Sequence, residues 1–154
     1  MAAVKNKWAL ASIIILCLAV ATTLTAIYYY YQYSNLVEKL EKSKAIINLG
    51  IDYGNGTRIW FNGTRGLTLY DAMLEAGWIV DAESYGAMGL YVKSINGVEQ
   101  SVEQSRYWSW WIWTSLGWAA GGSACDKYIL SNGETIIWYY SYVDPATYKM
   151  TPPP

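Results

Sequence analysis

An uninterrupted apolar stretch near the N-terminus dominates the pattern of hydrophobic and polar positions in this chain. No residue between Trp8 and Val37 carries a charge. Residues 8–33 are the densest part, and as an α-helix rising about 1.5 Å per residue they would measure about 39 Å. The hydrocarbon core of a bilayer is about 30 Å thick, so this segment is long enough to cross it with some tilt. The pattern therefore predicts a transmembrane helix over residues 8–33.

Tyrosines gather at the C-terminal end of this expected span. They are Tyr28, Tyr29, Tyr30, Tyr31 and Tyr33. Tyrosine combines an apolar ring with a polar hydroxyl and is enriched where lipid meets water. Beyond them, Leu36, Val37 and Leu40 share one helical stripe, which predicts that residues 34–44 continue as a short helical stalk.

A cleaved signal peptide is the alternative interpretation of the same stretch. Lys5 and Lys7 would form its basic region, residues 8–18 its apolar core and Ala19-Val20-Ala21 its cleavage site, with cleavage after residue 21. The chain stays apolar well beyond Ala21, farther than a secretory signal requires, and this favours an uncleaved anchor. Both interpretations place the rest of the chain outside the cytoplasm.

Charges near the two ends of the span do not decide its orientation, since two lysines precede it and three follow it. Two N-G-T sequons begin at Asn55 and Asn62, and such sites are used only outside the cytoplasm. The same tripeptide is also typical of turns. We expect residues 1–7 to be a cytoplasmic tail, the chain to pass once through the lipid bilayer of the cell membrane, and the C-terminal domain to be extracytoplasmic, with Asn55 and Asn62 as glycosylation sites.

After the stalk the hydrophobic period changes from 3.6 to 2. Ile47, Leu49, Ile51 and Tyr53 alternate with other residues, and a Gly-Asn-Gly turn at 54–56 leads into TRIWF, which predicts a β-hairpin. A helix follows. Its expected N-cap is Thr68, with Asp71 three residues later, its apolar stripe is Leu69, Met73 and Leu74, and Gly77 ends it.

The remaining segments have the composition of strands separated by turns. They are GLYVKSI, a turn at Asn96-Gly97, YWSWWIW with a loop at 114–125, KYIL, a turn at Asn132-Gly133, and ETIIWYYSYV. The order ββαβββ over residues 45–143 predicts a single α+β domain in which a mixed sheet packs on one helix, the layout of a β-grasp. Residues 144–154 are expected to be an exposed proline-rich tail.

Composition narrows the classes of function. Eleven basic and twelve acidic residues give a net charge of −1 without a long run of one sign, which argues against a nucleic-acid partner. The chain contains no histidine, the commonest general base and metal ligand. Cys17 lies in the span and Cys125 in the folded part, so they are not expected to form a disulfide. We expect no catalytic residues and no metal site.

Three segments of the folded part carry a family resemblance. They are SYGAMGLYVKSINGVEQ, YWSWWIW and SACDKYILSNGETIIWYY. Together they resemble the small β-grasp domain found at the C-terminus of transcobalamin and intrinsic factor. The resemblance implies the fold and suggests a corrinoid as ligand. Because the large helical domain of those vitamin carriers is absent from this sequence, at most half of such a binding site is implied.

Tryptophan is concentrated in one segment, with five of the nine falling between Trp108 and Trp118. If Trp108 is a core position, as the resemblance implies, then Trp111 and Trp113 lie on the opposite face of the strand. Exposed aromatic patches mark contact surfaces. The candidate ligand- or partner-binding residues are Tyr85, Tyr91, Tyr107, Trp111, Trp113 and Trp118. The alternative is that another part of the chain, such as the 114–125 loop, covers this face.

These features predict a non-enzymatic, membrane-anchored binding module that presents an aromatic surface to a flat apolar ligand such as a corrinoid. The alternative is a structural protein, either an accessory subunit of a membrane complex or a pilin-like subunit of a surface filament that self-assembles. Neither Lys5-Asn6 nor Lys7-Trp8 resembles a prepilin cleavage junction, which weakens the filament hypothesis but leaves the accessory subunit open.

Overall fold

The computed structural model describes the backbone of residues 2–154 and the side chains from residue 7 onward. The expected tail at 1–7, with Lys5, therefore lies almost wholly outside the described side chains. The chain divides into two compact units, a single helix up to Ser43 and a folded domain over Lys44–Pro154. This is the α+β architecture that the sequence predicts, with a long apolar helix followed by a mixed-sheet domain that contains a second, short helix.

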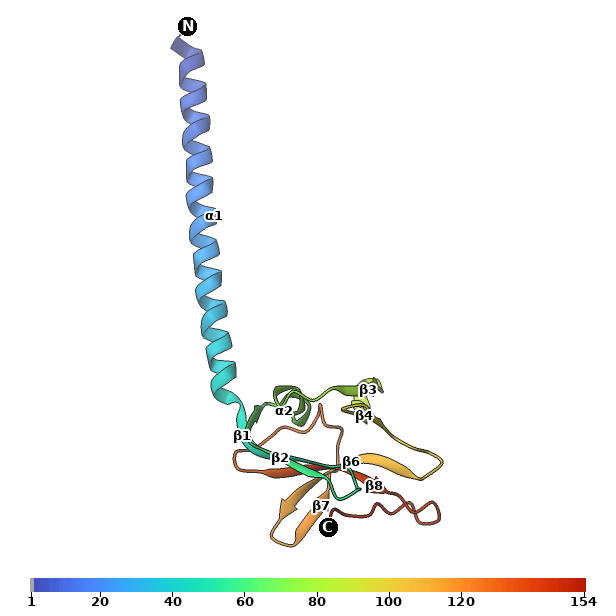
Figure 1. Cartoon of the computed structure of the whole chain (residues 1–154). Coiled ribbons are helices and arrows are strands. Elements are labelled where there is room, and N and C mark those ends of the chain that lie inside the picture. Colours follow the sequence, from blue (N-terminus) through green and yellow to red (C-terminus); the bar gives the residue numbers. More distant parts are fainter. Residues whose placement is uncertain (1) are drawn as a thin grey trace. The chain divides into compact units, whose positions relative to one another are not determined.

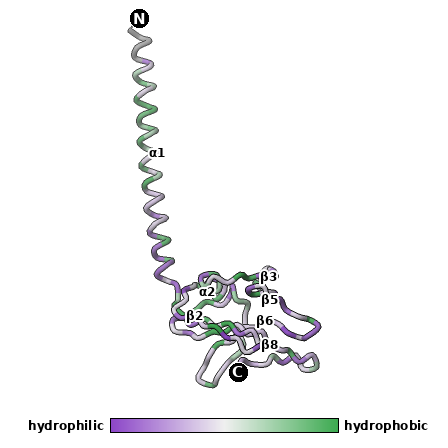
Figure 2. Tube along the Cα trace, in the orientation of Figure 1, coloured by the Kyte–Doolittle hydropathy of each residue, from purple (hydrophilic) through white to green (hydrophobic). Residues whose placement is uncertain are grey.

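The first unit is one unbroken helix, α1 (Ala2–Ser43). The part from Lys7 to Ser43 is long and apolar enough to cross a membrane, a test that a signal sequence also passes. Apolar residues dominate the N-terminal half of α1 and polar ones its last turns (Figure 2). The hydroxyls of Ser12, Thr23 and Thr25 donate hydrogen bonds to carbonyls four residues earlier, so these polar groups are satisfied without water. The helix is consistent with a single-pass anchor.

The second unit is built on a five-stranded sheet with the order β2-β1-β8-β6-β7 (Figure 1). The strands are β1 (Ala45–Asp52), β2 (Arg58–Gly66), β6 (Arg106–Thr114), β7 (Gly117–Ala120) and β8 (Thr135–Tyr142). β1 and β8 pair in parallel, and the other neighbours are antiparallel. The last strand of the chain therefore lies at the centre of the sheet, beside the first.

A smaller antiparallel sheet with the order β3-β4-β5 lies beside it. Its strands are β3 (Val80–Ser84), β4 (Leu90–Ile95) and β5 (Val98–Glu99), and a 3₁₀ turn, η1 (Gly86–Met88), joins the first two. The sequence analysis missed β3 because its residues are largely polar and exposed. The expected turn at Asn96-Gly97 joins β4 to β5, and both residues have positive φ, as a two-residue hairpin requires.

The short helix α2 (Leu69–Glu75) supplies the centre of the hydrophobic core. Thr68 and Asp71 form the expected capping box, in which each side chain accepts a hydrogen bond from the other residue's backbone N–H. Leu69, Ala72 and Met73 are fully buried. Leu74, expected on the same stripe, is half exposed, and Ala72 takes its place because a helix this short buries only one narrow face.

KYIL, expected to be a strand, is not one. Only Ile129 makes a bridge, with Thr68, and the backbone there bonds to the segment before α2, with Leu130 N–H donating to the carbonyl of Leu67. The turn at Asn132-Gly133 consequently joins no hairpin. Asn132 Oδ1 accepts from the N–H of Ile46, and Gly133 N–H donates to the carbonyl of the same residue. The turn thus fixes the start of β1.

Residues 144–154 are mostly exposed, but they fold back on the domain. Tyr148 N–H donates to the carbonyl of Asp144, and Thr151 N–H to the carbonyl of Tyr142 in β8. Arg58 in β2 donates to the carbonyl of Pro154 and forms an ion pair with the buried Asp52. The segment therefore runs from the end of β8 to β2 and forms part of the domain surface.

We expect Thr68→Ala to destabilise the domain by about 1 kcal/mol, because losing an N-cap side chain leaves helical N–H groups unsatisfied. The measurement is the free energy of unfolding in urea, followed by tryptophan emission of the full chain in mild detergent. Thr151→Ala is the matched control, since Thr151 is exposed and its side chain caps no helix. Equal stability of the two variants would contradict the assigned capping box.

Candidate functional site

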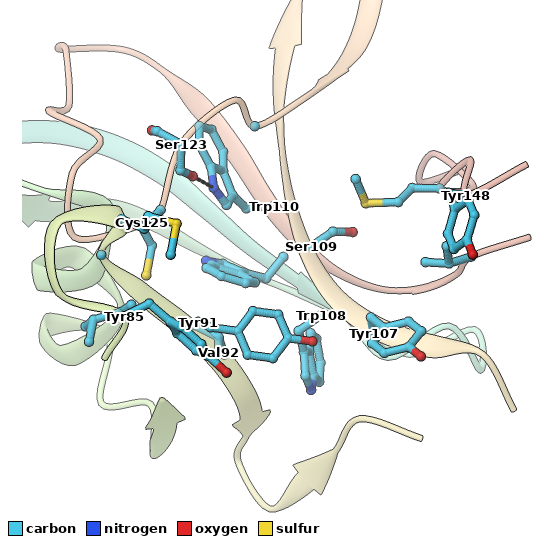
Figure 3. A pocket seen from close by; sticks show the side chains of 18 of the residues that line it. Tyr85, Tyr91, Val92, Tyr107, Trp108, Ser109, Trp110, Ser123, Cys125 and Tyr148 are labelled. Atoms are coloured by element: carbon cyan, nitrogen blue, oxygen red, sulfur yellow. Dashed lines mark hydrogen bonds between the residues drawn. The ribbon is translucent and has the colours of Figure 1, made fainter. Parts of the chain in front are cut away.

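A cavity of about 770 Å³ opens beside the first half of β6 (Figure 3). Its walls come from η1 and β4, from β6, from the loop after β7 and from the C-terminal segment. The aromatic side chains that line it are Tyr85, Tyr91, Tyr107, Trp108, Trp110, Trp138 and Tyr148. Met88, Cys125 and Met150 add sulfur-containing side chains. The site is therefore a concave, largely aromatic surface.

The cavity exists because β7 is too short to cover the edge of β6. β7 pairs only with Trp111–Thr114, and Gly121 N–H then donates to the carbonyl of Trp110. At the other end of β6, Arg106 exchanges two backbone hydrogen bonds with Ser101. Since main-chain polar groups alternate between the two edges of a strand, the N–H and C=O of Trp108 point to this same open edge, between the two paired regions.

Hydrogen bonds hold the tryptophan rings of the wall. Trp110 Nε1 donates to the carbonyl of Ser123 at 2.9 Å, and Trp108 Nε1 donates to the carbonyl of Val98 at 2.7 Å. Tyr85 and Tyr91 pack edge to face with ring centroids 6.3 Å apart, and the Tyr91 hydroxyl donates to Gln100. Tyr148 in the C-terminal segment is 82% exposed, so it forms the rim.

Two glycines permit the close approach of the walls. A Cβ at Gly121 would lie 2.0 Å from the ring of Trp110. A Cβ at Gly89 would lie 2.5 Å from Ala124 and from Asp126 Oδ1, and Gly89 has a φ of +94°. Asp126 Oδ1 accepts the N–H of Leu90 at 2.7 Å, and this bond is the main cause of the lowered pKa of Asp126. The carboxylate thus ties β4 to the 121–128 loop.

The lining contains no Asp, Glu, Lys or Arg side chain. Burial, with a smaller contribution from the adjacent Asp126, raises the pKa of the Cys125 thiol to about 12. Burial also raises the pKa of Tyr91, with smaller contributions from Tyr107 and Tyr85. The described lining is therefore uncharged at neutral pH and suits an uncharged ligand.

The structure divides the six candidate binding residues into two groups. Tyr85, Tyr91 and Tyr107 line the cavity, whereas Trp111, Trp113 and Trp118 do not. Trp111 was expected to lie exposed on the face opposite Trp108, and the predicted exposure is wrong. It lies on that face but is only 6% exposed, beside the fully buried Ile137 of β8.

Trp113 and Trp118 pair across the β6–β7 hairpin, with ring centroids 5.0 Å apart. Trp118 also stacks on Trp60 of β2 at 6.4 Å, and Trp60 reaches over Gly50, where a Cβ would lie 2.7 Å from its ring. The sequence analysis named the 114–125 loop as the cover for this face only in its alternative interpretation. Part of that segment forms the strand β7. The ring that packs on Trp118 from outside the hairpin is Trp60.

Sequence reasoning missed Trp110 and Trp138 as parts of the cavity, because both are also core residues of the alternating pattern. It also missed Tyr148 and Met150, since residues 144–154 read as a tail. The sequon residues Asn55 and Asn62 are both exposed. Among the residues that the structure describes, no three His, Cys, Asp or Glu side chains lie close enough together to hold a metal ion.

Comparison with known proteins adds a family and a fold. Residues 66–142 match a family model described as a domain of unknown function, DUF4430. A crystal structure from Ruminococcus gnavus ATCC 29149, provisionally described as a metal binding protein, is similar with a TM-score of 0.51 and 19% identity over 62% of this chain and 94% of that chain. At this identity the likeness shows the fold alone.

A crystal structure of haptocorrin in complex with Cbi aligns with a TM-score of 0.49 and 17% identity. The alignment covers 62% of this chain and 25% of that chain. A comparison with curated protein sequences gave no match.

We expect Gly121→Ala to destabilise the domain by about 1–3 kcal/mol, because the added methyl group must displace the Trp110 ring or the backbone. Gly122→Ala is the control, since a Cβ there meets no atom within 4 Å, and we expect its effect to stay within about 0.5 kcal/mol. Urea unfolding of both variants checks this. A Gly121→Ala protein as stable as Gly122→Ala would show that the wall is looser than the structure indicates.

The Cys125 thiol gives a pH prediction. A group whose pKa is raised on folding contributes stability that is fully present below its unfolded pKa and is lost as the pH rises through the folded value. The advantage of wild type over Cys125→Ala should therefore narrow from about pH 9 toward pH 12. Unfolding free energies of the two proteins across this range provide the measurement, and parallel curves would rule out a buried, protonated thiol.

Proposed function

We propose that this chain, which belongs to the DUF4430 family, is a membrane-anchored extracytoplasmic binding module without enzymatic activity. Its site is the cavity between β4, β6 and the C-terminal segment. Its ligand is flat, largely apolar and uncharged, and a corrinoid is the candidate suggested by the sequence resemblance. The apolar helix α1 supplies the anchor.

The uncharged aromatic lining is the observation that supports a binding role most directly. Ligand sites are typically concave, mostly apolar and about 300–1000 Å³ in volume, with a few polar groups that set orientation. The cavity of about 770 Å³ lies in this range. The backbone of Trp108 at the open strand edge and the hydroxyl of Tyr107 offer the polar contacts. A flat ring system could stack on the aromatic walls while its polar substituents bond to these groups.

The character of the titratable groups supports binding without chemistry. The lining contains tyrosines and one cysteine, and a cysteine acts as a nucleophile only as the thiolate. With a pKa of about 12, Cys125 stays protonated at neutral pH. A general acid or base works best with a pKa near the operating pH, and the pKa of Tyr91 is moved away from it.

The test is a titration of the full chain in mild detergent with cobinamide, a corrinoid probe. Trp108, Trp110 and Trp138 line the cavity, so binding should quench tryptophan emission. We expect Tyr107→Ala to weaken binding about fivefold, the effect of losing roughly 1 kcal/mol of ring contact. Trp113→Ala is the control, because this exposed ring lies outside the cavity, and its affinity should equal that of wild type.

Loss of binding in Trp113→Ala with no change in Tyr107→Ala would move the site to the opposite face of the sheet. Absence of quenching by cobinamide would exclude a corrinoid. If the chain extracted from its native membrane also carried stoichiometric protein partners, the accessory-subunit hypothesis would replace the binding module.

A further inference from the structure

Four consecutive residues of β6 line the cavity, namely Tyr107, Trp108, Ser109 and Trp110 (Figure 3). Successive side chains of a strand point to opposite faces of the sheet. A cavity over one face of the sheet would therefore be lined by every second residue only. Because both faces contribute, the cavity lies beside the edge of β6, at the place where a neighbouring strand would otherwise pair.

Two tryptophan rings extend under this open edge. Trp108 Nε1 donates to the carbonyl of Val98 in β5, and Trp110 Nε1 donates to the carbonyl of Ser123 in the loop after β7. The segments that carry these two carbonyls also bond to the open edge of β6, one on either side of the gap. Tyr107 projects on the opposite face of the strand. A flat ring in the gap would therefore have aromatic side chains on both of its faces.

Three main-chain groups of β6 face this gap, the N–H and C=O of Trp108 and the N–H of Trp110. Outside the strand ladders, no hydrogen bond of the described residues 2–154 involves any of the three. Trp108 is only 5% exposed and Trp110 only 6%. Buried main-chain groups are nearly always hydrogen-bonded. This stretch of edge is therefore suited to bond to a molecule that occupies the cavity.

The gap fits a single ring and not an added strand. Arg106 and Ser101 exchange two backbone hydrogen bonds at one end, and the Trp110 carbonyl accepts the N–H of Gly121 at the other. From Trp108 to Trp110 the edge measures about 7 Å, since a strand rises about 3.4 Å per residue. A donor, an acceptor and a second donor follow one another along this length, in the order Trp108 N–H, Trp108 C=O and Trp110 N–H.

We infer that the ligand of the cavity is a neutral planar heterocycle with a lactam or imide edge, which enters the gap and bonds to the main chain of Trp108 and Trp110. Such an edge carries a carbonyl next to an N–H, the complement of the groups on the strand. A few polar groups of this kind commonly orient a ligand in an otherwise apolar site. The inference rests on the proposed binding role of the cavity and deepens it by naming the chemistry that orients the ligand.

The test compares lumiflavin, a neutral flat tricycle with an imide edge, with its N3-methyl derivative, in which the N–H of that edge is blocked. Each is titrated by calorimetry into the full chain in mild detergent, with protein-free detergent as the blank. We expect lumiflavin to bind at least about tenfold more tightly, because the methylated ring leaves the buried Trp108 carbonyl without a donor. Tyr107→Ala should weaken both probes by a similar factor and preserve their ratio, since the main chain supplies the discrimination. Trp113→Ala, outside the cavity, should change neither affinity.

Hydrogen exchange gives a second measurement, which reports on the edge itself. Bound lumiflavin should slow the exchange of the Trp108 and Trp110 amides at least about threefold, because each N–H gains an acceptor. Residues 58–62 of β2 are the internal control, and their exchange should not change. The N3-methyl derivative should give less protection at both tryptophan amides.

Equal affinities of the two probes, or unchanged exchange at residues 108–110, would overturn recognition by the strand edge and leave the aromatic site in place. Binding of cobinamide without any binding of lumiflavin would also overturn this inference alone. If neither lumiflavin nor cobinamide bound, the inference and the corrinoid proposal would be overturned together.

Discussion

The parallel pairing of β1 with β8 is the interaction on which the rest of the domain depends. It joins the first strand of the domain to the last, from Asn48 opposite Thr135 to Asp52 opposite Tyr139, and the Asn132-Gly133 turn holds the start of β1 in register through two hydrogen bonds to Ile46. With β8 at the centre, β6 must take the next position, and only the short β7 remains to cover its outer edge. The half-covered edge then becomes the wall of the cavity. The site is thus a consequence of sheet topology rather than of a dedicated loop.

The tryptophan-rich strand β6 contributes differently on its two faces. Trp108 and Trp110 belong to the hydrophobic core as well as to the cavity wall. On the other face, Trp111 is buried beside Ile137, whereas Trp113 stays largely exposed. Of the two interpretations offered by the sequence, packing therefore holds for Trp111, whereas a contact surface at Trp113 stays a prediction. The dividing line falls where the pairing of β6 with β8 ends at Ile112, beyond which β6 pairs with β7 alone.

Local signals made much of the fold predictable. The capping box at Thr68, the Asn96-Gly97 turn and the alternation in β1, β6 and β8 each depend on neighbouring residues, and each is found in the structure. The cavity was only half predictable. Tyr85, Tyr91 and Tyr107 lie in the segments of resemblance, but the contribution of Tyr148 depends on residues 144–154 folding back on the domain, which no local pattern encodes. The prediction of a strand at KYIL was wrong for the same reason. Its composition suits a strand, but its backbone forms hydrogen bonds with the segment before α2.

The indole nitrogens give a physical reason why tryptophan rather than phenylalanine stands at positions 108 and 110. The chain has nine tryptophans and one phenylalanine, so apolar volume alone is not what the positions require. Trp108 donates its indole N–H to the backbone carbonyl of Val98 in β5, and Trp110 donates its own to the carbonyl of Ser123 in the loop after β7. Each bond fixes the plane of a ring and ties β6 to a different neighbouring segment. A wall whose rings are already oriented loses little conformational freedom when a flat ligand stacks on it. Tyr148, by contrast, lies exposed at the rim, so the tryptophan wall and not the rim sets the shape of the proposed site.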